Sequence, residues 1–360
     1  MTFTDLTSLG WDEYFSTRFD ELPNGHPRPA RITRVDRGAC DLLSSDGPLR
    51  ATLASDLAKV VAHDPERAPC VGDWAAVDGA DGRDRPAVLT HLLERRTAFR
   101  RTGVTPGTSR AQVLAANVDL AVIVEPLRPD PDLGRLERLL ALAWESGALP
   151  IIALTKSDIV SDSAEVRVAV AAAAPGVGVH AVSSLDTASL EPVRALLAEG
   201  RTLALLGPSG AGKSTLTNAL AGRELMVTRE LRADAKGRHT TSHRELFVMP
   251  GGGLVIDTPG LRSVGLTADV DGLSRVFDDI EALAATCRFH DCGHRHEPGC
   301  AVHAAVESGD LAERRLASWH KLQREVSWMA RRQDARLQSE ERDRWKRIHL
   351  EVRRSGRIRP

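Results

Sequence analysis

The sequence has few aromatic residues and no long apolar run. Aromatic residues make up 4% of the 360 positions, with a single tyrosine. This scarcity disfavours a binding mode built mainly on rows of stacking side chains. No apolar stretch approaches the about 20 residues that cross a bilayer, and the N-terminus lacks the basic-then-apolar pattern of a secretory signal. We therefore expect a cytoplasmic protein with no membrane partner.

A disulfide framework and a strong overall charge are also missing. The chain has five cysteines, an odd number, and three of them lie within Cys287–Cys300, which favours a metal site over disulfides. The net charge is −1, yet Lys321–Pro360 holds thirteen Lys or Arg against six Asp or Glu. This basic and helix-compatible end is as consistent with a solvated helix as with a surface that faces RNA.

The central motif follows the apolar run Leu203–Leu206 and precedes a helix-like segment. It reads G-x-x-x-x-G-K-S and comprises Gly207, Pro208, Ser209, Gly210, Ala211, Gly212, Lys213, Ser214 and, next in the chain, Thr215. The glycines allow backbone N–H groups to point at phosphate oxygens, Lys213 can reach the terminal phosphates, and the Ser214 hydroxyl can bind Mg²⁺. The sequence therefore predicts a nucleoside triphosphate site.

Two loops upstream of this motif predict that the base is guanine. Thr155, Lys156, Ser157 and Asp158 follow the apolar run Ile151–Leu154, and Ser183 and Ser184 follow Val182. The Asp158 carboxylate can accept from both guanine N1–H and the 2-amino group, a match that adenine does not offer. On its own, the first loop would equally suit a polar connection with a helix N-cap. Together with the phosphate loop, the two loops favour GTP.

The switch elements lie downstream of the phosphate loop. Asp257 and Gly260 form a D-x-x-G after a buried strand, where the Asp can hold Mg²⁺ and the Gly N–H can meet the γ-phosphate. The polar segment 233–244 predicts a switch loop, in which Thr240 or Thr241 supplies a second hydroxyl for Mg²⁺. Leu261 stands where many GTPases have a water-orienting Gln, and His239 is the nearest replacement, either catalytic or merely exposed.

The order of these elements is unusual, because the base loops precede the phosphate loop. The same sheet forms if the domain is opened elsewhere and its old ends are joined, so we predict a circularly permuted α/β domain over residues 102–272. About five short strands in 28–101 predict a barrel of the OB or SH3-like type. Residues 1–27 contain a possible short amphipathic helix, and the arginine-rich segment 94–110 predicts a flexible connector, either solvated or touching phosphates.

The cysteine cluster predicts a structural zinc site. Cys287, Cys292, His294 and Cys300 offer three thiolates and an imidazole, a closed set that suits tetrahedral Zn²⁺. His290, His296 and His303 compete for the fourth position. We assign this zinc-binding, mainly helical domain to residues 273–330 and a basic helical tail to 331–360.

These motifs, in this order, resemble the ribosome small-subunit-dependent GTPase A family (RsgA/YjeQ type). Val71–Trp74 and Ala116–Asp119 also resemble the barrel and domain-entry segments of that family. The resemblance covers about residues 28–330, and Thr155 departs from it, since Asn is common there. It implies an OB-type barrel, a circularly permuted GTPase and a zinc domain. It also implies late maturation of the small ribosomal subunit, rRNA binding, and GTP hydrolysis stimulated by the subunit.

We therefore expect a monomeric GTPase that uses GTP, Mg²⁺ and one structural Zn²⁺ and works on the small ribosomal subunit and its rRNA. Two other classes stay open from the residues alone. A P-loop nucleotide kinase or another metabolic GTPase with an accessory zinc module would turn over without ribosomes. A nucleic-acid-binding scaffold would hold GTP without hydrolysing it.

Overall fold

The computed structural model describes residues 5–23, 27–79, 87–102, 111–226, 244–257 and 271–333. These residues form two compact units, one containing the described residues up to Asp257 and one containing 271–333. The predicted switch residues His239, Thr240, Thr241 and Gly260 lie outside the described residues, as does the tail beyond Gln333. Within the described part of the chain, no helix is long and apolar enough to cross a membrane.

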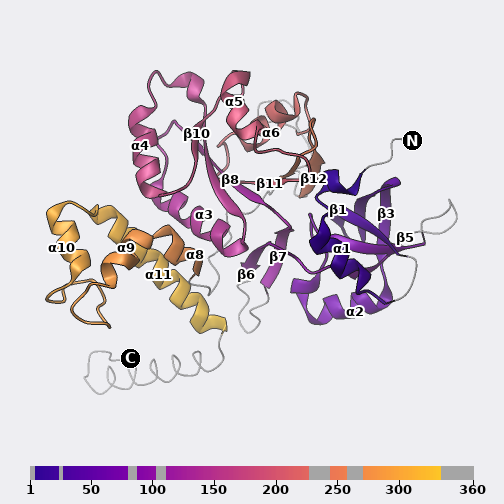
Figure 1. Cartoon of the computed structure of the whole chain (residues 1–360), viewed down its shortest axis with the longest axis horizontal. Coiled ribbons are helices and arrows are strands. Elements are labelled where there is room, and N and C mark those ends of the chain that lie inside the picture. Colours follow the sequence, from indigo (N-terminus) through magenta and orange to yellow (C-terminus); the bar gives the residue numbers. More distant parts are fainter. Residues whose placement is uncertain are drawn as a thin grey trace, which may run out of the picture. The chain divides into compact units, whose positions relative to one another are not determined.

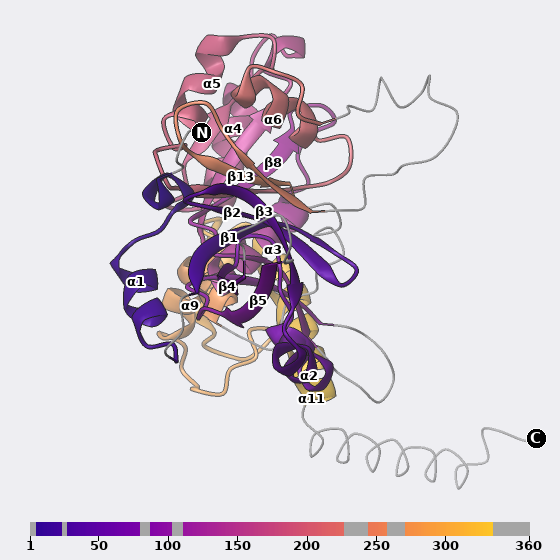
Figure 2. The same cartoon turned by 90° about the vertical axis from the view of Figure 1, so that its right-hand side faces the viewer.

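The first unit contains a closed barrel of five strands (Figures 1 and 2). The strands are β1 (Arg28–Asp36), β2 (Ala39–Ser44), β3 (Gly47–Leu53), β4 (Trp74–Asp78) and β5 (Ala87–Leu92). Closure occurs because β1 pairs with both β2 and β4, while β5 joins β4 to β3. Alternate residues such as Ile32, Leu42 and Leu89 fill the interior. β4 begins at Trp74, two residues after Gly72, whose φ of +90° lies in a turn.

The second half of this unit is an α/β layer structure. Its strands are β8 (Leu120–Pro126), β9 (Leu149–Thr155), β10 (Val179–Ala181), β11 (Thr202–Leu206), β12 (Glu245–Val248) and β13 (Leu254–Asp257). Its helices are α3 (Leu133–Ser146), α4 (Ala164–Ala173), α5 (Thr187–Arg194) and α6 (Lys213–Ala221). The order β10-β9-β8-β11-β13 is parallel, and β12 adds antiparallel to β13.

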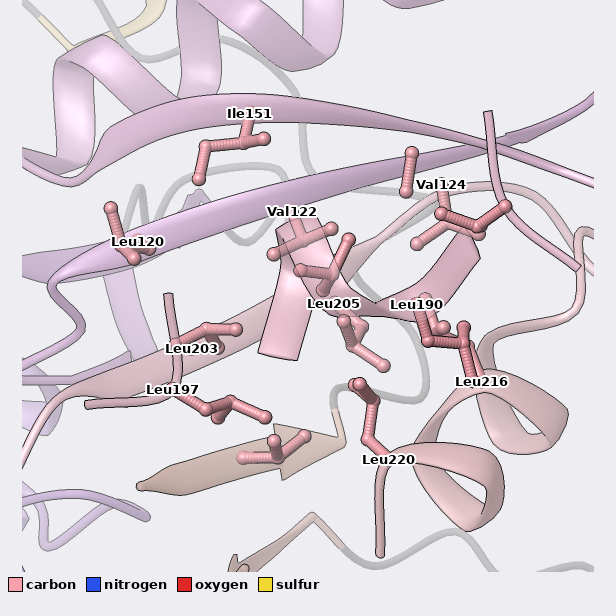
Figure 3. Close-up of a cluster of buried hydrophobic side chains, with 14 of the residues drawn as sticks. Leu120, Val122, Val124, Ile151, Leu190, Leu197, Leu203, Leu205, Leu216 and Leu220 are labelled. Atoms are coloured by element: carbon pink, nitrogen blue, oxygen red, sulfur yellow. The ribbon is translucent and has the colours of Figure 1, made fainter. Parts of the chain in front are cut away.

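Two layers of helices cover this sheet. Leu190 of α5 and Leu216 and Leu220 of α6 pack on Leu205 and its neighbours (Figure 3), whereas α3 and α4 lie on the opposite side (Figure 1). The phosphate-loop strand β11 is central in the sheet although it is the fourth of the parallel strands in chain order. The prediction of a rearranged α/β domain is thus confirmed at the level of strand order.

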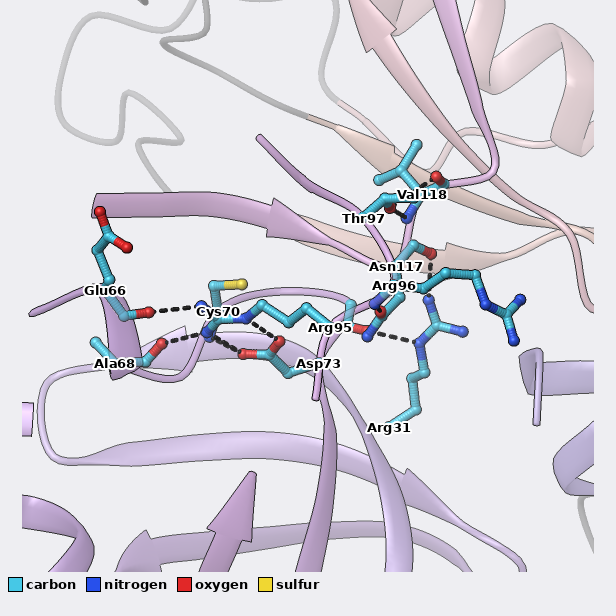
Figure 4. A network of polar contacts seen from close by, with 11 residues as sticks. Arg31, Glu66, Ala68, Cys70, Asp73, Arg95, Arg96, Thr97, Asn117 and Val118 are labelled. Carbon is cyan, nitrogen blue, oxygen red and sulfur yellow. Dashed lines mark hydrogen bonds and ion pairs between the residues drawn. The ribbon is translucent and has the colours of Figure 1, made fainter. Parts of the chain in front are cut away.

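The barrel and the α/β half share one continuous sheet. Arg34 of β1 pairs with Glu245 of β12, which extends the sheet to eleven strands. The fully buried Arg31 of β1 donates to four oxygens, and Figure 4 shows its bond to the Asn117 carbonyl. The acceptors are the carbonyls of Leu9, Gly72 and Asn117, at 2.5, 3.0 and 2.9 Å, and Thr202 Oγ1 at 3.1 Å. Burial lowers the pKa of this guanidinium to about 10, so it stays charged at neutral pH.

The N-terminal residues pack against this junction. They form the 3-10 helix η1 (Leu6–Leu9) and α1 (Glu13–Asp20), which confirms the expected short helix. The Asp12 side chain caps α1 by accepting from Tyr14 N. Trp11 meets Trp74 edge to face at 4.7 Å between ring centroids, and Leu9 is fully buried. Leu9 and Phe15 therefore belong to the core of the first unit.

We predict that Arg31→Met destabilises the first unit on the order of 3–5 kcal/mol, because it removes the donor to the buried carbonyls of Leu9 and Asn117. Thermal unfolding of the full chain measures this loss. Arg34→Met serves as the control, since the side chain of Arg34 is 35% exposed and pairs with Asp36. Equal stability of the two variants would contradict the prediction.

The expected flexible connector at 94–110 is wrong for the described residues. β6 (Ala98–Thr102) and β7 (Ala111–Ala116) form an antiparallel pair, with Phe99 buried. Arg95 is neither solvated nor available to phosphates, because it forms a buried ion pair with Asp73 at 2.7 Å (Figure 4). It also donates to the carbonyls of Glu66 and Ala68. Among the described arginines, Arg95 thus belongs to a buried ion pair, and others lie in the strand β6, which pairs with β7.

The second unit is helical. Its described helices are α8 (Asp271–Val276), α9 (Asp278–Ala284), α10 (Ala301–Ser308) and α11 (Glu313–Gln333). Arg315 of α11 is buried and contacts Asp279 of α9 through Nε at 2.6 Å and Nη2 at 2.8 Å. This bidentate contact fixes the long helix on α9.

Candidate functional site

The phosphate loop joins β11 to α6. Gly207, Gly210 and Gly212 all have positive φ, and a side chain at Gly207 would overlap the Val124 carbonyl of the neighbouring strand. The first helical residue is Lys213, and no side chain caps the helix at Gly212. The N–H groups of the first turn are therefore available to an anion, as a phosphate site requires.

Lys213 is already folded over the loop. Its ammonium group donates to the carbonyls of Gly207 and Pro208, both at 2.8 Å. This places the positive charge within the curl of backbone amides, where it can face terminal phosphates. Ser214 is partly exposed next to it, and Thr215 is exposed.

Thr155 links the first base loop to the phosphate loop. Its hydroxyl donates to the Ala211 carbonyl at 2.6 Å and lies 3.4 Å from the Glu125 carbonyl. The side chain is buried at the end of β9, and a Cβ at Gly212 would lie 3.5 Å from its hydroxyl oxygen. A hydroxyl therefore makes the bridge at the position where the resemblance leads us to expect Asn.

The two base loops meet each other. Lys156 has a left-handed backbone (φ +63°), which turns the chain sharply after β9 and leaves its side chain exposed. Ser183 Oγ donates to Asp158 Oδ1 at 2.6 Å and accepts from Leu185 N at 3.1 Å. Ser157 N bonds the Val182 carbonyl at 3.2 Å. Ser183 thus holds Asp158 through its Oδ1 atom, while the exposed carboxylate remains available to a ligand. Ser184, the residue after Ser183, is also exposed.

Asp257 completes the described part of the site. It is the last residue of β13, is 9% exposed, and lies in register with Leu205 of β11. Because the carboxyl ends of parallel strands share one edge of a sheet, Asp257, the phosphate loop and both base loops lie at that edge. The residues predicted from the sequence are brought together as far as they are described.

One structural pair at this edge was missed by the sequence analysis. Glu125 at the end of β8 is fully buried and is held by Arg135 of α3 in two contacts of 2.8 and 2.7 Å. The hydrogen bond with Glu125 raises the pKa of Arg135. The pair fixes the start of α3 next to the strand that supports Gly207. The sequence signal for this pair is Glu125 at the end of an apolar strand, ten positions before Arg135.

The cysteine cluster forms the predicted group in the second unit. The ligand atoms of Cys287, Cys292, His294 and Cys300 lie within 4.8 Å of one another. His294 Nδ1 is 3.6 Å from the sulfurs of Cys287 and Cys300. Backbone N–H groups of Ala301 and His303 donate to the sulfurs of Cys287 and Cys300, respectively.

The loop that carries these ligands has its own anchor. Glu297 accepts from the backbone N–H groups of Gly293, Arg295 and His296 at 2.7–3.0 Å. These donors, led by Arg295, lower the pKa of Glu297 to about 2. The competing imidazoles His296 and His303 face each other instead, and among the described residues the metal-competent group contains His294 alone of the histidines.

Comparison with known proteins agrees with this arrangement. The model of the RsgA GTPase family matches residues 92–267. A small ribosomal subunit biogenesis GTPase RsgA of Streptomyces avermitilis is 49% identical over 346 residues, which cover 95% of this chain and 91% of that protein. The chain belongs to the RsgA GTPase family. A relative with the same description from Opitutus terrae is 44% identical, with 98% of each chain covered.

Two solved structures share the fold. YjeQ from Thermotoga maritima aligns with a TM-score of 0.61 at 21% identity, covering 84% of this chain and 99% of its own. YloQ, described as a circularly permuted GTPase, aligns with a TM-score of 0.58 at 26% identity, covering 86% and 99%. As a member of the RsgA GTPase family, the chain is a GTP hydrolase with the permuted strand order seen in its own sheet.

Proposed function

We propose that this chain is a GTP-timed factor in late maturation of the small ribosomal subunit. The observation that carries the proposal is the set of phosphate loop and base loops at one sheet edge, in a chain 49% identical to a small ribosomal subunit biogenesis GTPase over 95% of its length. GTP binding would order the switch elements next to this edge. Contact with the subunit would complete the hydrolytic site, and hydrolysis would release the factor.

Each described residue of the site has a proposed role. Residues 207–215 cradle the phosphates, with Lys213 facing the terminal groups and Ser214 binding Mg²⁺. Asp158 reads guanine N1–H and the 2-amino group, Lys156 lies over the base, and the loop at Ser183 and Ser184 faces the guanine carbonyl. Asp257 supports Mg²⁺ from β13. We propose that Thr240 or Thr241 supplies the second hydroxyl that binds Mg²⁺. The backbone N–H of Gly260 would contact the γ-phosphate, and His239 would orient the attacking water.

The other parts would serve attachment to the subunit. We propose that the five-stranded barrel is of the OB type and contacts rRNA together with the second unit. Cys287, Cys292, His294 and Cys300 would hold one Zn²⁺ as a closed set of four ligands, so the metal supports the fold and takes no part in hydrolysis. A monomer suffices for this function, because every proposed ligand comes from one chain.

Hydrolysis with and without purified small subunits tests the proposal. We expect slow release of phosphate from GTP by the chain alone and marked stimulation by small subunits, with no stimulation by large subunits. Transfer of the γ-phosphate to a small-molecule acceptor without ribosomes would instead support a nucleotide kinase. Binding of GTP without hydrolysis in either condition would support a scaffold.

The bridge at Thr155 yields a separate prediction. Thr155→Val keeps the shape of the side chain but removes the hydroxyl that bonds the Ala211 carbonyl. The loss of one buried hydrogen bond should weaken GTP binding by about 1–2 kcal/mol, or roughly 5- to 30-fold, measured by titration calorimetry. Thr155→Asn offers the amide expected in the family and should bind more tightly than Thr155→Val. Equal affinities of Thr155→Val and the unaltered chain would contradict this role.

A further inference from the structure

The long helix α11 is held rigidly on one side within the second unit. Trp319 Nε1 donates to Glu281 at 3.3 Å, and Arg315 contacts Asp279. His320 Nε2 lies 3.0 Å from the carbonyl of the metal-cluster residue His294. Leu322, Val326 and Met329 are buried along the same side. The orientation of α11 about its axis is therefore fixed by the packing of its inner side.

The opposite side of α11 carries cations around an exposed indole. At about 100° per residue, Lys321, Arg324, Trp328 and Arg331 fall within an arc of about 80° and span about 15 Å along the axis. Lys321 and Arg324 are exposed, and Trp328 is 42% exposed. Among the described residues, no ion pair joins Lys321, Arg324 or Arg331 to a carboxylate. We call these four residues the α11 outer face.

We propose that the α11 outer face binds an unpaired nucleotide of RNA, with the base stacked on Trp328 and the flanking phosphates held by Lys321, Arg324 and Arg331. Stacking on an aromatic ring accepts any base, and guanidinium groups neutralise the backbone on either side. Arg324 lies four residues before Trp328 and Arg331 three residues after it, about one helical turn on either side. The proposal rests on the proposed function and assigns one of its RNA-binding sites.

The chemistry of this face favours RNA over a protein partner. A protein interface gains most from a broad apolar core, whereas here Trp328 is the exposed aromatic residue amid three cations on its own helix. Among the described residues, the one acid at (i, i+4) spacing from a cation of this face is Glu325, four residues after Lys321. α11 has six Lys or Arg and only two Glu, one of them at its first position. The charge complements a polyanion.

Binding of a labelled short oligouridylate and of purified small subunits tests the site, with fluorescence anisotropy and sedimentation as readouts. Trp328→Ala should weaken binding of the oligouridylate at least about fivefold, as expected for loss of one stacked base. Trp328→Phe should retain most of the affinity because it keeps an aromatic ring. The double variant Arg324→Gln, Arg331→Gln should reduce the slope of log K against log salt by about 1.4, the value for two single-strand phosphate contacts.

Arg314→Gln is the matched control, since Arg314 is exposed on the same helix about 21 Å from Trp328 along the axis. Its effect should be smaller than that of Arg324→Gln, with zinc content and basal GTP hydrolysis unchanged in all variants. Unchanged RNA binding by Trp328→Ala, or a loss with no change in the salt slope of the double arginine variant, overturns the proposal. If the unaltered chain binds the oligouridylate through this face but not small subunits, the proposed function fails and the RNA site stands.

Discussion

Asp158→Asn should convert this GTPase into a protein that prefers xanthosine triphosphate. The carboxylate accepts from two donors of guanine, and each hydrogen bond to a charged acceptor is worth about 1.5–3 kcal/mol. Losing this match should weaken GTP binding about a hundredfold to ten-thousandfold. Xanthine carries a carbonyl in place of the 2-amino group, so the asparagine amide can donate to it and restore affinity.

The structure indicates that this substitution changes the contact with the base and preserves the loop. Ser183 Oγ donates to Asp158 Oδ1, and an asparagine oxygen can accept the same bond. The loop therefore keeps its conformation while the group that faces the base changes from acceptor to donor. Recovery of hydrolysis with xanthosine triphosphate would also show that the variant is folded.

Competition between GTP, ATP and xanthosine triphosphate for the two proteins provides the measurement. Asp162→Asn is the control, because Asp162 is an exposed carboxylate four residues further on that caps Ala164 N. It should leave the preference for GTP unchanged. A variant at Asp158 that still prefers GTP to xanthosine triphosphate would place base recognition elsewhere.

The residues of the nucleotide site could be predicted from the sequence because each belongs to a local motif. The phosphate loop and Asp158 follow apolar strand segments directly, so their motif and the nearby strand appear together in a few residues. The contacts between the base loops and the phosphate loop could not be predicted individually from the sequence. The bond from Thr155 to the Ala211 carbonyl joins residues 56 positions apart, and no local pattern reports such a contact.

The barrel junction shows the same limit more strongly. Arg31 contacts Leu9, Gly72, Asn117 and Thr202, whereas its sequence context is an ordinary alternating strand. Composition alone predicts a flexible connector at 94–110, whereas in the described part of this segment Arg95 forms a buried ion pair with Asp73. Arginine is suited to such ion pairs through its planar set of donors. The polar composition therefore predicted an exposed segment, although the pairing of Arg95 with the distant Asp73 buries it.

The other large effect should follow removal of zinc from the second unit. Four ligand atoms within 4.8 Å of one another would bring three thiolates into mutual repulsion without a cation. A structural zinc site of this kind contributes about 10–16 kcal/mol of apparent binding free energy in small peptides at neutral pH. We therefore expect a chelator to unfold residues 287–300 and loosen α10 and α11. GTP binding should persist, since its proposed ligands all lie in the first unit.

His294→Gln separates this site from the neighbouring imidazoles. It should abolish retention of one equivalent of zinc, measured by elemental analysis, and lower the helix content in circular dichroism. His303→Gln removes an imidazole close to the cluster whose ring faces His296, so this control should keep both the metal and the fold. Zinc retention by His294→Gln would assign the fourth ligand elsewhere. A second unit that keeps its helices after chelation would show that packing such as the Arg315–Asp279 contact suffices without metal.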